Sequence, residues 1–140
     1  MANTKVKGYV IALTVGDKTI VGTTSETFSG GGVLKESIQK SDSGQTQYAN
    51  AGFDGNFSVS AFVYNGSAAT TGELNIENLM DYCAKNTTGN FEFAFGADSG
   101  DPLVTGTCTF MSCTVNSDSE NYADCTVDLR VTSTPHVGTV

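Results

Sequence analysis

The sequence of 140 residues contains a single histidine, His136, which lies close to the C-terminus. A Ser-His-Asp or Cys-His catalytic arrangement would have to use this residue, and such arrangements are built on rigid scaffolds. Phosphate-binding fingerprints of the types GxxxxGK[ST] and GxGxxG are absent, and the glycines Gly30–Gly32 do not replace one. Paired carboxylates for glycoside hydrolysis remain an open alternative, although the chain has no tryptophan to form a sugar platform. The sequence therefore argues against an enzyme.

Basic residues are also few, with seven Lys and Arg against fifteen Asp and Glu, which gives a formal net charge of −8. Proteins that grip nucleic acid backbones need clustered Lys and Arg, so this class of partner is disfavoured. Only 16% of the residues are charged, and solubility must therefore rest largely on hydroxyl and amide groups. The acidity by itself needs no explanation beyond solubility.

No apolar run approaches the roughly 18 residues that a membrane span requires, so we expect no membrane partner. Lys5 and Lys7 precede an apolar stretch, as at the start of a signal peptide. That stretch is short, alternates and enters a turn at Gly16 and Asp17, which favours a first strand. We therefore expect the protein to stay in the cytoplasm where it is made.

The four cysteines form no CxxC pair, and a single histidine cannot complete the usual zinc spacings. Two disulfides would be possible in an oxidising compartment, but no export signal supports one. The favoured interpretation is that Cys83, Cys108, Cys113 and Cys125 are small buried hydrophobic residues. The acidic pairs Asp98/Asp101 and Asp118/Glu120 lie in turns without the spacing of an EF-hand. We predict no metal and no cofactor.

Most of the remaining chain has the pattern of β-strands. The clearest strand is predicted at Ala123–Thr132, where Asp124 and Asp128 alternate with apolar residues and point outward. One amphipathic helix is predicted over Thr71–Asn86, with Ile76, Leu79, Met80 and Cys83 on its apolar stripe. The other expected strands are Val6–Val15, Lys18–Thr24 (paired with the first as a hairpin), Asn56–Tyr64, Phe91–Phe95 and Leu103–Val115. This order predicts one domain, residues 1–140, with a mainly β sandwich or barrel and one flanking α-helix.

The long polar stretch Ser25–Asn56 cannot build a core, and loops of this length are usually functional or disordered. It could form a projecting hairpin or arm whose apolar residues are covered by a neighbouring subunit. The candidates for such contacts are Phe28, Leu34, Ile38, Tyr48 and Phe53. Alternatively, these side chains fold back onto their own domain. At the other end of the chain, residues 134–140 are expected to form a loose tail.

The order and lengths of these segments resemble the major tail proteins of long-tailed phages, in particular the TP901-1-like and gene-transfer-agent tail tubes. The resemblance covers residues 6–133 and is carried by VIALTVGDKTIVGTTS, the arm with LKESIQKSD, DGNFSVSAFV, ELNIENLMDYC, FEFAF and the closing TGTCTFMSCTVNSDSENYADCTVDLRVTS. It implies a tail-tube fold of two packed antiparallel sheets with a flanking helix.

The resemblance also implies an assembly. Subunits of this family form six-membered rings that stack into a hollow tube, and the inner strands join edge to edge around a lumen. The long arm, residues 25–56, contacts adjacent subunits. Partners would be further copies of the chain, a tape-measure protein, and tail terminator and distal tail proteins. DNA would pass through the lumen of the virion tail without specific binding, and Asp124 and Asp128 are candidates for the lumen wall.

The main alternative is a ligand- or carbohydrate-binding β-sandwich of the adhesion or Ig-like kind, because sandwiches occur without sequence similarity. That alternative predicts a soluble monomer with exposed aromatic residues on a ligand face. A hydrolytic enzyme on a β scaffold is the third interpretation, and the usual catalytic groups are missing for it.

Overall fold

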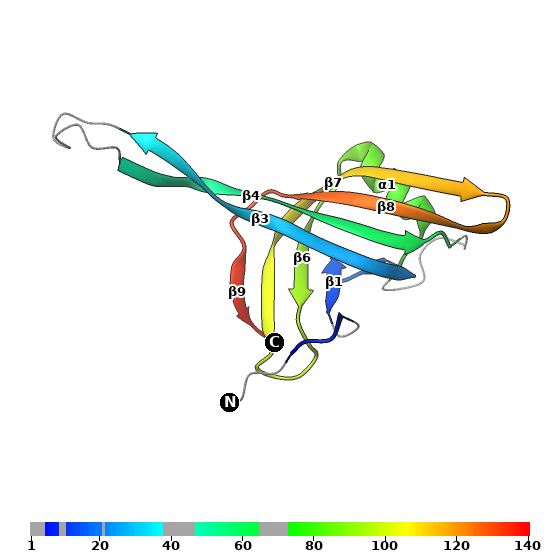
Figure 1. The fold of residues 1–140 in the computed structure, drawn as a ribbon, viewed down its shortest axis with the longest axis horizontal. Coiled ribbons are helices and arrows are strands. Elements are labelled where there is room, and N and C mark those ends of the chain that lie inside the picture. Colours follow the sequence, from blue (N-terminus) through cyan, green and yellow to red (C-terminus); the bar gives the residue numbers. More distant parts are fainter. Residues whose placement is uncertain (1–4, 9–10, 21, 38–46, 65–72) are drawn as a thin grey trace.

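The computed structural model describes residues 5–8, 11–20, 22–37, 47–64 and 73–140. Antiparallel strands dominate this part of the chain, and a single short helix accompanies them (Figure 1). The elements are β1 (Ala12–Val15), β2 (Thr19–Ile20), β3 (Thr23–Ser37), β4 (Gln47–Phe62), β5 (Glu73–Leu74), α1 (Ile76–Lys85), β6 (Thr88–Ala94), β7 (Pro102–Asp118), β8 (Asn121–Val131) and β9 (His136–Thr139).

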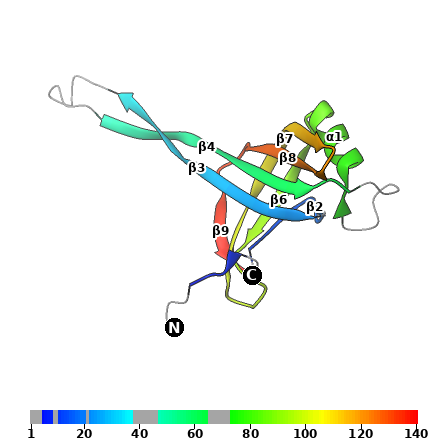
Figure 2. The ribbon, with the colours of Figure 1, turned by 45° about the vertical axis from the view of Figure 1, so that its right-hand side comes forward.

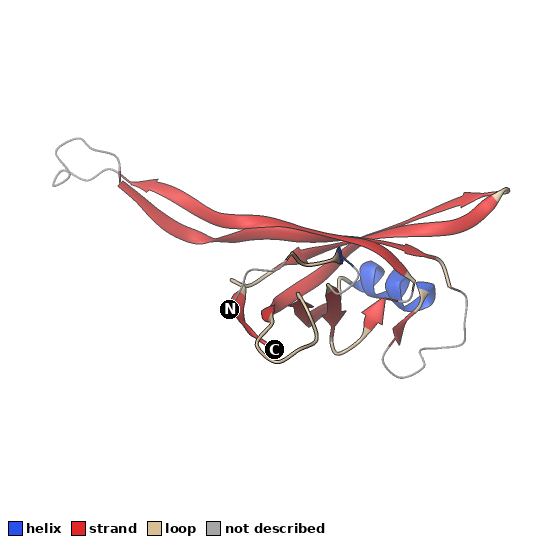
Figure 3. Ribbon diagram, turned by 60° about the horizontal axis from the view of Figure 1, so that its bottom comes forward, coloured by secondary structure: helices blue, strands red, loops and turns tan. Residues whose placement is uncertain are grey.

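Seven of the strands form one sheet in the order β1-β6-β7-β8-β4-β3, with β9 paired to β7. The long strand β7 belongs to two layers, because its first half pairs with β6 and its second half with β8. The pairing with β8 shifts register between Phe110 and Ser112, close to the point where the pairing with β6 ends. Figure 3 shows the long strands on one side and the short strands and helix on the other. The mainly β prediction with one helix is confirmed, and the two layers are parts of one curled sheet.

The core lies between these layers and is rich in phenylalanine. Phe57 of β4 is fully buried, and its ring centroid lies 5.0 Å from that of Phe91 and 5.3 Å from that of Phe93, both on β6. Edge-to-face pairs of this kind add about 0.5–1.5 kcal/mol each to the burial of their area. The predicted strand at Phe91–Phe95 thus turns the rings of Phe91 and Phe93 inward, where they pack against Phe57 of the opposite layer.

The helix begins later than predicted because Glu73 and Leu74 pair with β2 in a short parallel ladder. Asn75 caps α1, since its side chain accepts a hydrogen bond from the Asn78 backbone N–H at 3.2 Å. The Asn78 side chain accepts one in return from the Asn75 N–H, which completes a capping box. Leu79 is buried as expected, whereas Met80 is 55% exposed although the apolar stripe included it.

Two sequence predictions about pairing and order are wrong. The expected opening hairpin does not form, because β1 pairs with β6 and β2 with β5, and only an isolated bridge joins Val15 to Lys18. The C-terminal residues are not a loose tail, because β9 pairs with the start of β7. The Val140 N–H continues this contact by donating to the Asp101 carbonyl at 2.8 Å. The pairing of β9 with β7 could not be predicted, because backbone hydrogen bonds to a distant strand produce no recognisable sequence pattern in a four-residue segment.

Candidate assembly surfaces

The polar stretch expected to be a long loop forms most of a long two-stranded hairpin, which we call the arm. Strands β3 and β4 stay paired from Thr23 and Ala61 at the base to Ser37 and Gln47 near the tip. Figures 1 and 2 show the arm extending far beyond the body of the molecule. The projecting hairpin that the sequence offered as one arrangement of this stretch is therefore confirmed, because cross-strand pairing satisfies the backbone even where small polar side chains supply no core.

The base of the arm packs on the chain's own core. The Phe28 ring lies 4.8 Å from that of Phe57, and the Phe53 ring stacks parallel to Phe28 at 6.2 Å. Phe53 also covers the cross-strand glycines Gly30 and Gly55, where an added Cβ would come within 2.8 and 2.5 Å of its ring. An aromatic ring over strand glycines compensates for their missing side chains. For Phe28 and Phe53 the structure thus gives the fold-back arrangement, with both half-buried.

The distal part of the arm is different, because its apolar side chains are in solvent. Leu34 is 65% exposed and Tyr48 64% exposed. A register shift between Val33 and Leu34 and a positive φ of 127° at Gly52 mark a bulge, which bends and twists a hairpin. The remaining candidate contact residue, Ile38, lies outside the described residues. The arm thus presents exposed apolar side chains beyond its bend.

The outward face of β3, β4, β8 and the second half of β7 is mainly polar, with Phe62 and Met111 as exposed apolar residues on it. Four charged residues lie on β4 and β8 of this face, namely Asp54, Asp124, Asp128 and Arg130. Arg130 donates to Asp54 at 2.7 Å, and the Ser112 hydroxyl donates to Asp128 at 3.1 Å. These groups surround a shallow depression of about 490 Å³. The alternation predicted for Ala123–Thr132 is confirmed in β8. It brings Asp124 and Asp128 to the same face of the sheet.

This four-stranded part of the sheet has two free edges. Strand β3 pairs only with β4, and β7 beyond Phe110 pairs only with β8, as far as the described residues go. Each step from β3 through β4 and β8 to β7 is antiparallel, so the two edge strands run in opposite directions. Exposed edges are templates for pairing with another chain. The charged residues in the sequence did not indicate that β3 and β7 would be edge strands.

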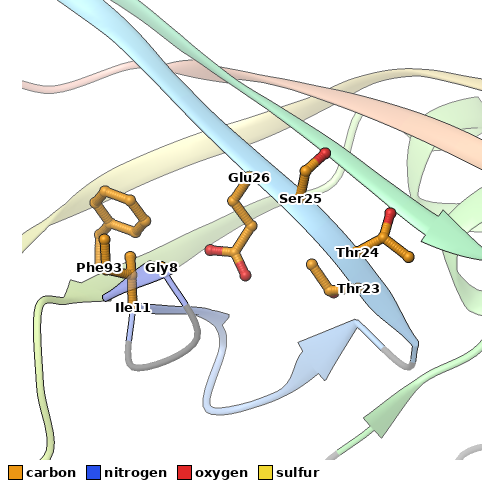
Figure 4. A pocket seen from close by; sticks show the side chains of 7 residues that line it. All are labelled: Gly8, Ile11, Thr23, Thr24, Ser25, Glu26 and Phe93. Carbon is orange, nitrogen blue, oxygen red and sulfur yellow. The ribbon is translucent and has the colours of Figure 1, made fainter. Parts of the chain in front are cut away.

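The curled sheet is open between its terminal strands β1 and β3, and we call this opening the seam. It holds a cavity of about 630 Å³ lined by Gly8, Ile11, Thr23, Thr24, Ser25, Glu26 and Phe93 (Figure 4). The Glu26 carboxylate points into it from β3. Its Oε2 atom is buried with no hydrogen-bond partner among the described residues, and burial raises the pKa of Glu26.

Sequence reasoning missed Glu26. Its spacing of two residues from Phe28 was the available signal, because a strand that turns Phe28 inward also turns Glu26 inward.

The four cysteines are free thiols, but the burial expected from the sequence holds only for Cys108 and Cys125, because Cys83 and Cys113 are half-buried. Burial raises the pKa of Cys83 and of Cys108 to about 11, and it also raises the pKa of Cys113 and Cys125. Thiols with raised pKa values are weak nucleophiles at neutral pH. Within the described ranges, no three His, Cys, Asp or Glu side chains gather as a metal site. The described helix is too short to cross a membrane.

Comparison with known proteins gives matches in structure alone. No family model and no curated protein sequence matches the chain. A chain from the tail of an empty gene transfer agent particle, refined with C6 symmetry, superposes with a TM-score of 0.61 at 13% identity, over 94% of both chains. The SPP1 tail tube protein gives 0.68 at 9% identity, over 97% of this chain and 80% of that one. The chain has the tail-tube fold.

The same fold extends to contractile injection systems. A chain from the sheath/tube terminator structure of the extracellular contractile injection system PVC gives a TM-score of 0.67 at 13% identity, over 99% of both chains. The tail-tube fold implied by the sequence resemblance is thereby confirmed.

Proposed function

We propose that the protein is a non-enzymatic structural subunit of a virion tail tube, in which six copies form a ring and rings stack into a hollow conduit. The observation that carries the proposal is the polar four-stranded sheet with two free, oppositely directed edges, found in a chain with the tail-tube fold. The C6 symmetry of the gene transfer agent tail supports the ring of six.

Ring closure follows from the strand directions. Because β3 and the second half of β7 run in opposite directions, β3 of one copy can pair antiparallel with β7 of the next. Each copy would then contribute four strands to a closed barrel, which removes every exposed edge of that sheet. The contact between copies is heterologous, because the β3 edge of one copy meets the β7 edge of the next. The same contact repeats around the ring until the last copy meets the first.

The polar face would then line the lumen. On β4 and β8, this face carries three acidic residues, Asp54, Asp124 and Asp128, and one basic residue, Arg130. Arg130 already forms an ion pair with Asp54. An excess of acid repels the phosphate backbone, so DNA could pass without specific binding. Assembly in the host cytoplasm and contacts with tape-measure, terminator and distal tail proteins belong to the same proposal.

The distal arm would hold successive rings together. Leu34 and Tyr48 are exposed in the single copy and would be covered by neighbouring subunits, as would Ile38. Each contact can be weak because it repeats around every ring, and linked weak contacts add to a high avidity.

The proposal is tested by negative-stain electron microscopy of the purified protein together with sizing over a range of concentrations. Rings or striated tubes are expected. The double variant Leu34→Ser/Tyr48→Ser should leave rings intact but abolish stacking, whereas Val137→Ser, at an exposed residue on the distant β9, should stack normally. A strict monomer at every concentration would contradict the proposal and favour the ligand-binding β-sandwich.

A further inference from the structure

The seam contains an acidic group that the single copy leaves unsatisfied. Among the described residues, Glu26 Oε2 is buried without a hydrogen-bond partner, although the cavity around it is large enough for another side chain. A buried polar atom that stays unpaired destabilises the fold. Glu26 lies on β3, one of the two free edge strands, and its side chain is on the inner face of the sheet beside Val59 of β4.

The opposite edge of the sheet carries a cation on the same inner side. The C-terminal end of α1 is fastened to β7, because the Asn86 side chain donates to the Phe110 carbonyl at 3.0 Å and the Phe110 N–H donates to the Thr87 carbonyl at 3.0 Å. Lys85 forms the last residue of the helix there, with its side chain 70% exposed. Its ion pair with Asp81 at 3.1 Å is exposed, and exposed helical pairs contribute little to stability.

Joining β3 of one copy to β7 of the next brings these two features to the same junction. The helix end lies under the inner face of β7, and the seam opens under the inner face of β3. We propose that, in the ring, the Lys85 ammonium of one copy enters the seam of the next copy and pairs with Glu26. This inference rests on the proposed tail-tube function and names a partner group for its ring contact.

The energetics favour the exchange. Lys85 would give up a weak exposed pair for a carboxylate whose Oε2 atom has no partner among the described residues, and charge-assisted hydrogen bonds are about twice as strong as neutral ones. Ile11 and Phe93 line the seam, so the charge pair would have apolar side chains beside it.

Zero-length carbodiimide cross-linking tests the pair directly. A mixture of ¹⁴N- and ¹⁵N-labelled protein is assembled, cross-linked, digested and analysed by mass spectrometry, with the same sample viewed by electron microscopy. The expected product is a mixed-label Glu26–Lys85 peptide. The Asp81–Lys85 pair within one chain provides the internal control for reactivity.

The two proposals fail in different ways. Rings without a mixed-label Glu26–Lys85 peptide would overturn the pairing and leave the tube function standing. A peptide that joins Glu26 to a lysine of its own chain, such as Lys5, would overturn it as well. A sample with neither rings nor mixed-label peptides would overturn the proposed function and this inference together.

Charge reversal gives an independent measurement. Lys85→Glu, an exposed helix position, should raise the protein concentration needed for ring formation by about tenfold or more, and Glu26→Lys should do the same. The double swap Glu26→Lys/Lys85→Glu should recover most of the loss. Glu92→Lys, the same charge change at an exposed position on β6, should assemble like the unmodified protein. Normal assembly of Lys85→Glu would refute the pairing even if Glu26→Lys fails to fold.

Discussion

Replacing Glu26 with glutamine should move the stability of the single copy and its assembly in opposite directions. Burial raises the pKa of the carboxyl group, so the folded state holds its proton more tightly than the unfolded chain does. The stabilisation that comes from this proton is therefore complete below the unfolded pKa, near 4.3, and is lost as the pH rises through the folded pKa. At neutral pH the charged group destabilises the fold.

The magnitude follows from the charge that the substitution removes, because the glutamine amide is also unpaired but costs less to bury than a carboxylate, for which an unpaired site costs more than the roughly 1–3 kcal/mol of a neutral group. Because Glu26 is only half-buried, water screens part of this cost, and we expect Glu26→Gln to add about 1 kcal/mol to the free energy of unfolding at pH 7. For a chain of this size that corresponds to a rise of roughly 3–4 °C in melting temperature. At pH 4 the difference should shrink, since both side chains are then largely neutral.

The assay is thermal and urea unfolding at protein concentrations below those that form rings, at pH 4 and pH 7, followed by ring formation at pH 7. Glutamine should stabilise the single copy yet raise the concentration needed for rings, because it cannot form the ion pair with Lys85. A variant that is less stable than the unmodified protein at pH 7, or equally different at both pH values, would refute the reasoning about Glu26 in the single copy.

Three further predictions concern stability and reactivity. Gly55→Ala should lower the free energy of unfolding by about 1–3 kcal/mol, because the new methyl group displaces the Phe53 ring, and urea unfolding measures it. An unchanged midpoint would contradict this packing. Asn75→Ala should cost about 1 kcal/mol through loss of the helix cap, seen as an earlier thermal transition, and no shift would argue against the capping box. Cys108, fully buried with a pKa of about 11, should resist iodoacetamide at pH 8 until the protein unfolds, and rapid labelling of the native protein would show that the core is open there.

Local sequence patterns predicted the elements that bury one clear face. Strand β8 alternates between outward acids and inward apolar residues such as Val127 and Leu129, and the structure follows this pattern. The helix stripe located α1 because Leu79 and its neighbours repeat with helical spacing. The burial of Cys108 and Cys125 was also predicted. In each case the signal lies within about ten residues and reports which side chains leave water.

Pairing between separate segments was harder to predict. The arm is rich in Ser, Thr and Gly, so the sequence suggested a projecting hairpin but did not distinguish it from a loop, and the length and register of the hairpin depend on the opposite strand. The same holds for β9, whose few residues gain order by pairing with the start of β7. Met80 illustrates the reverse case, because its helical spacing predicts burial but no part of the described chain covers it.

The sequence alone determined a mainly β domain with one amphipathic helix, an acidic surface and no catalytic set, because composition and short-range periodicity record the preference of each side chain for water or core. The tertiary structure decided that one sheet curls into two layers, that β3 and β7 remain as free edges, and that Glu26 points into an open seam. These features depend on which strands meet, and that is set by backbone hydrogen bonds and packing between residues far apart in the chain.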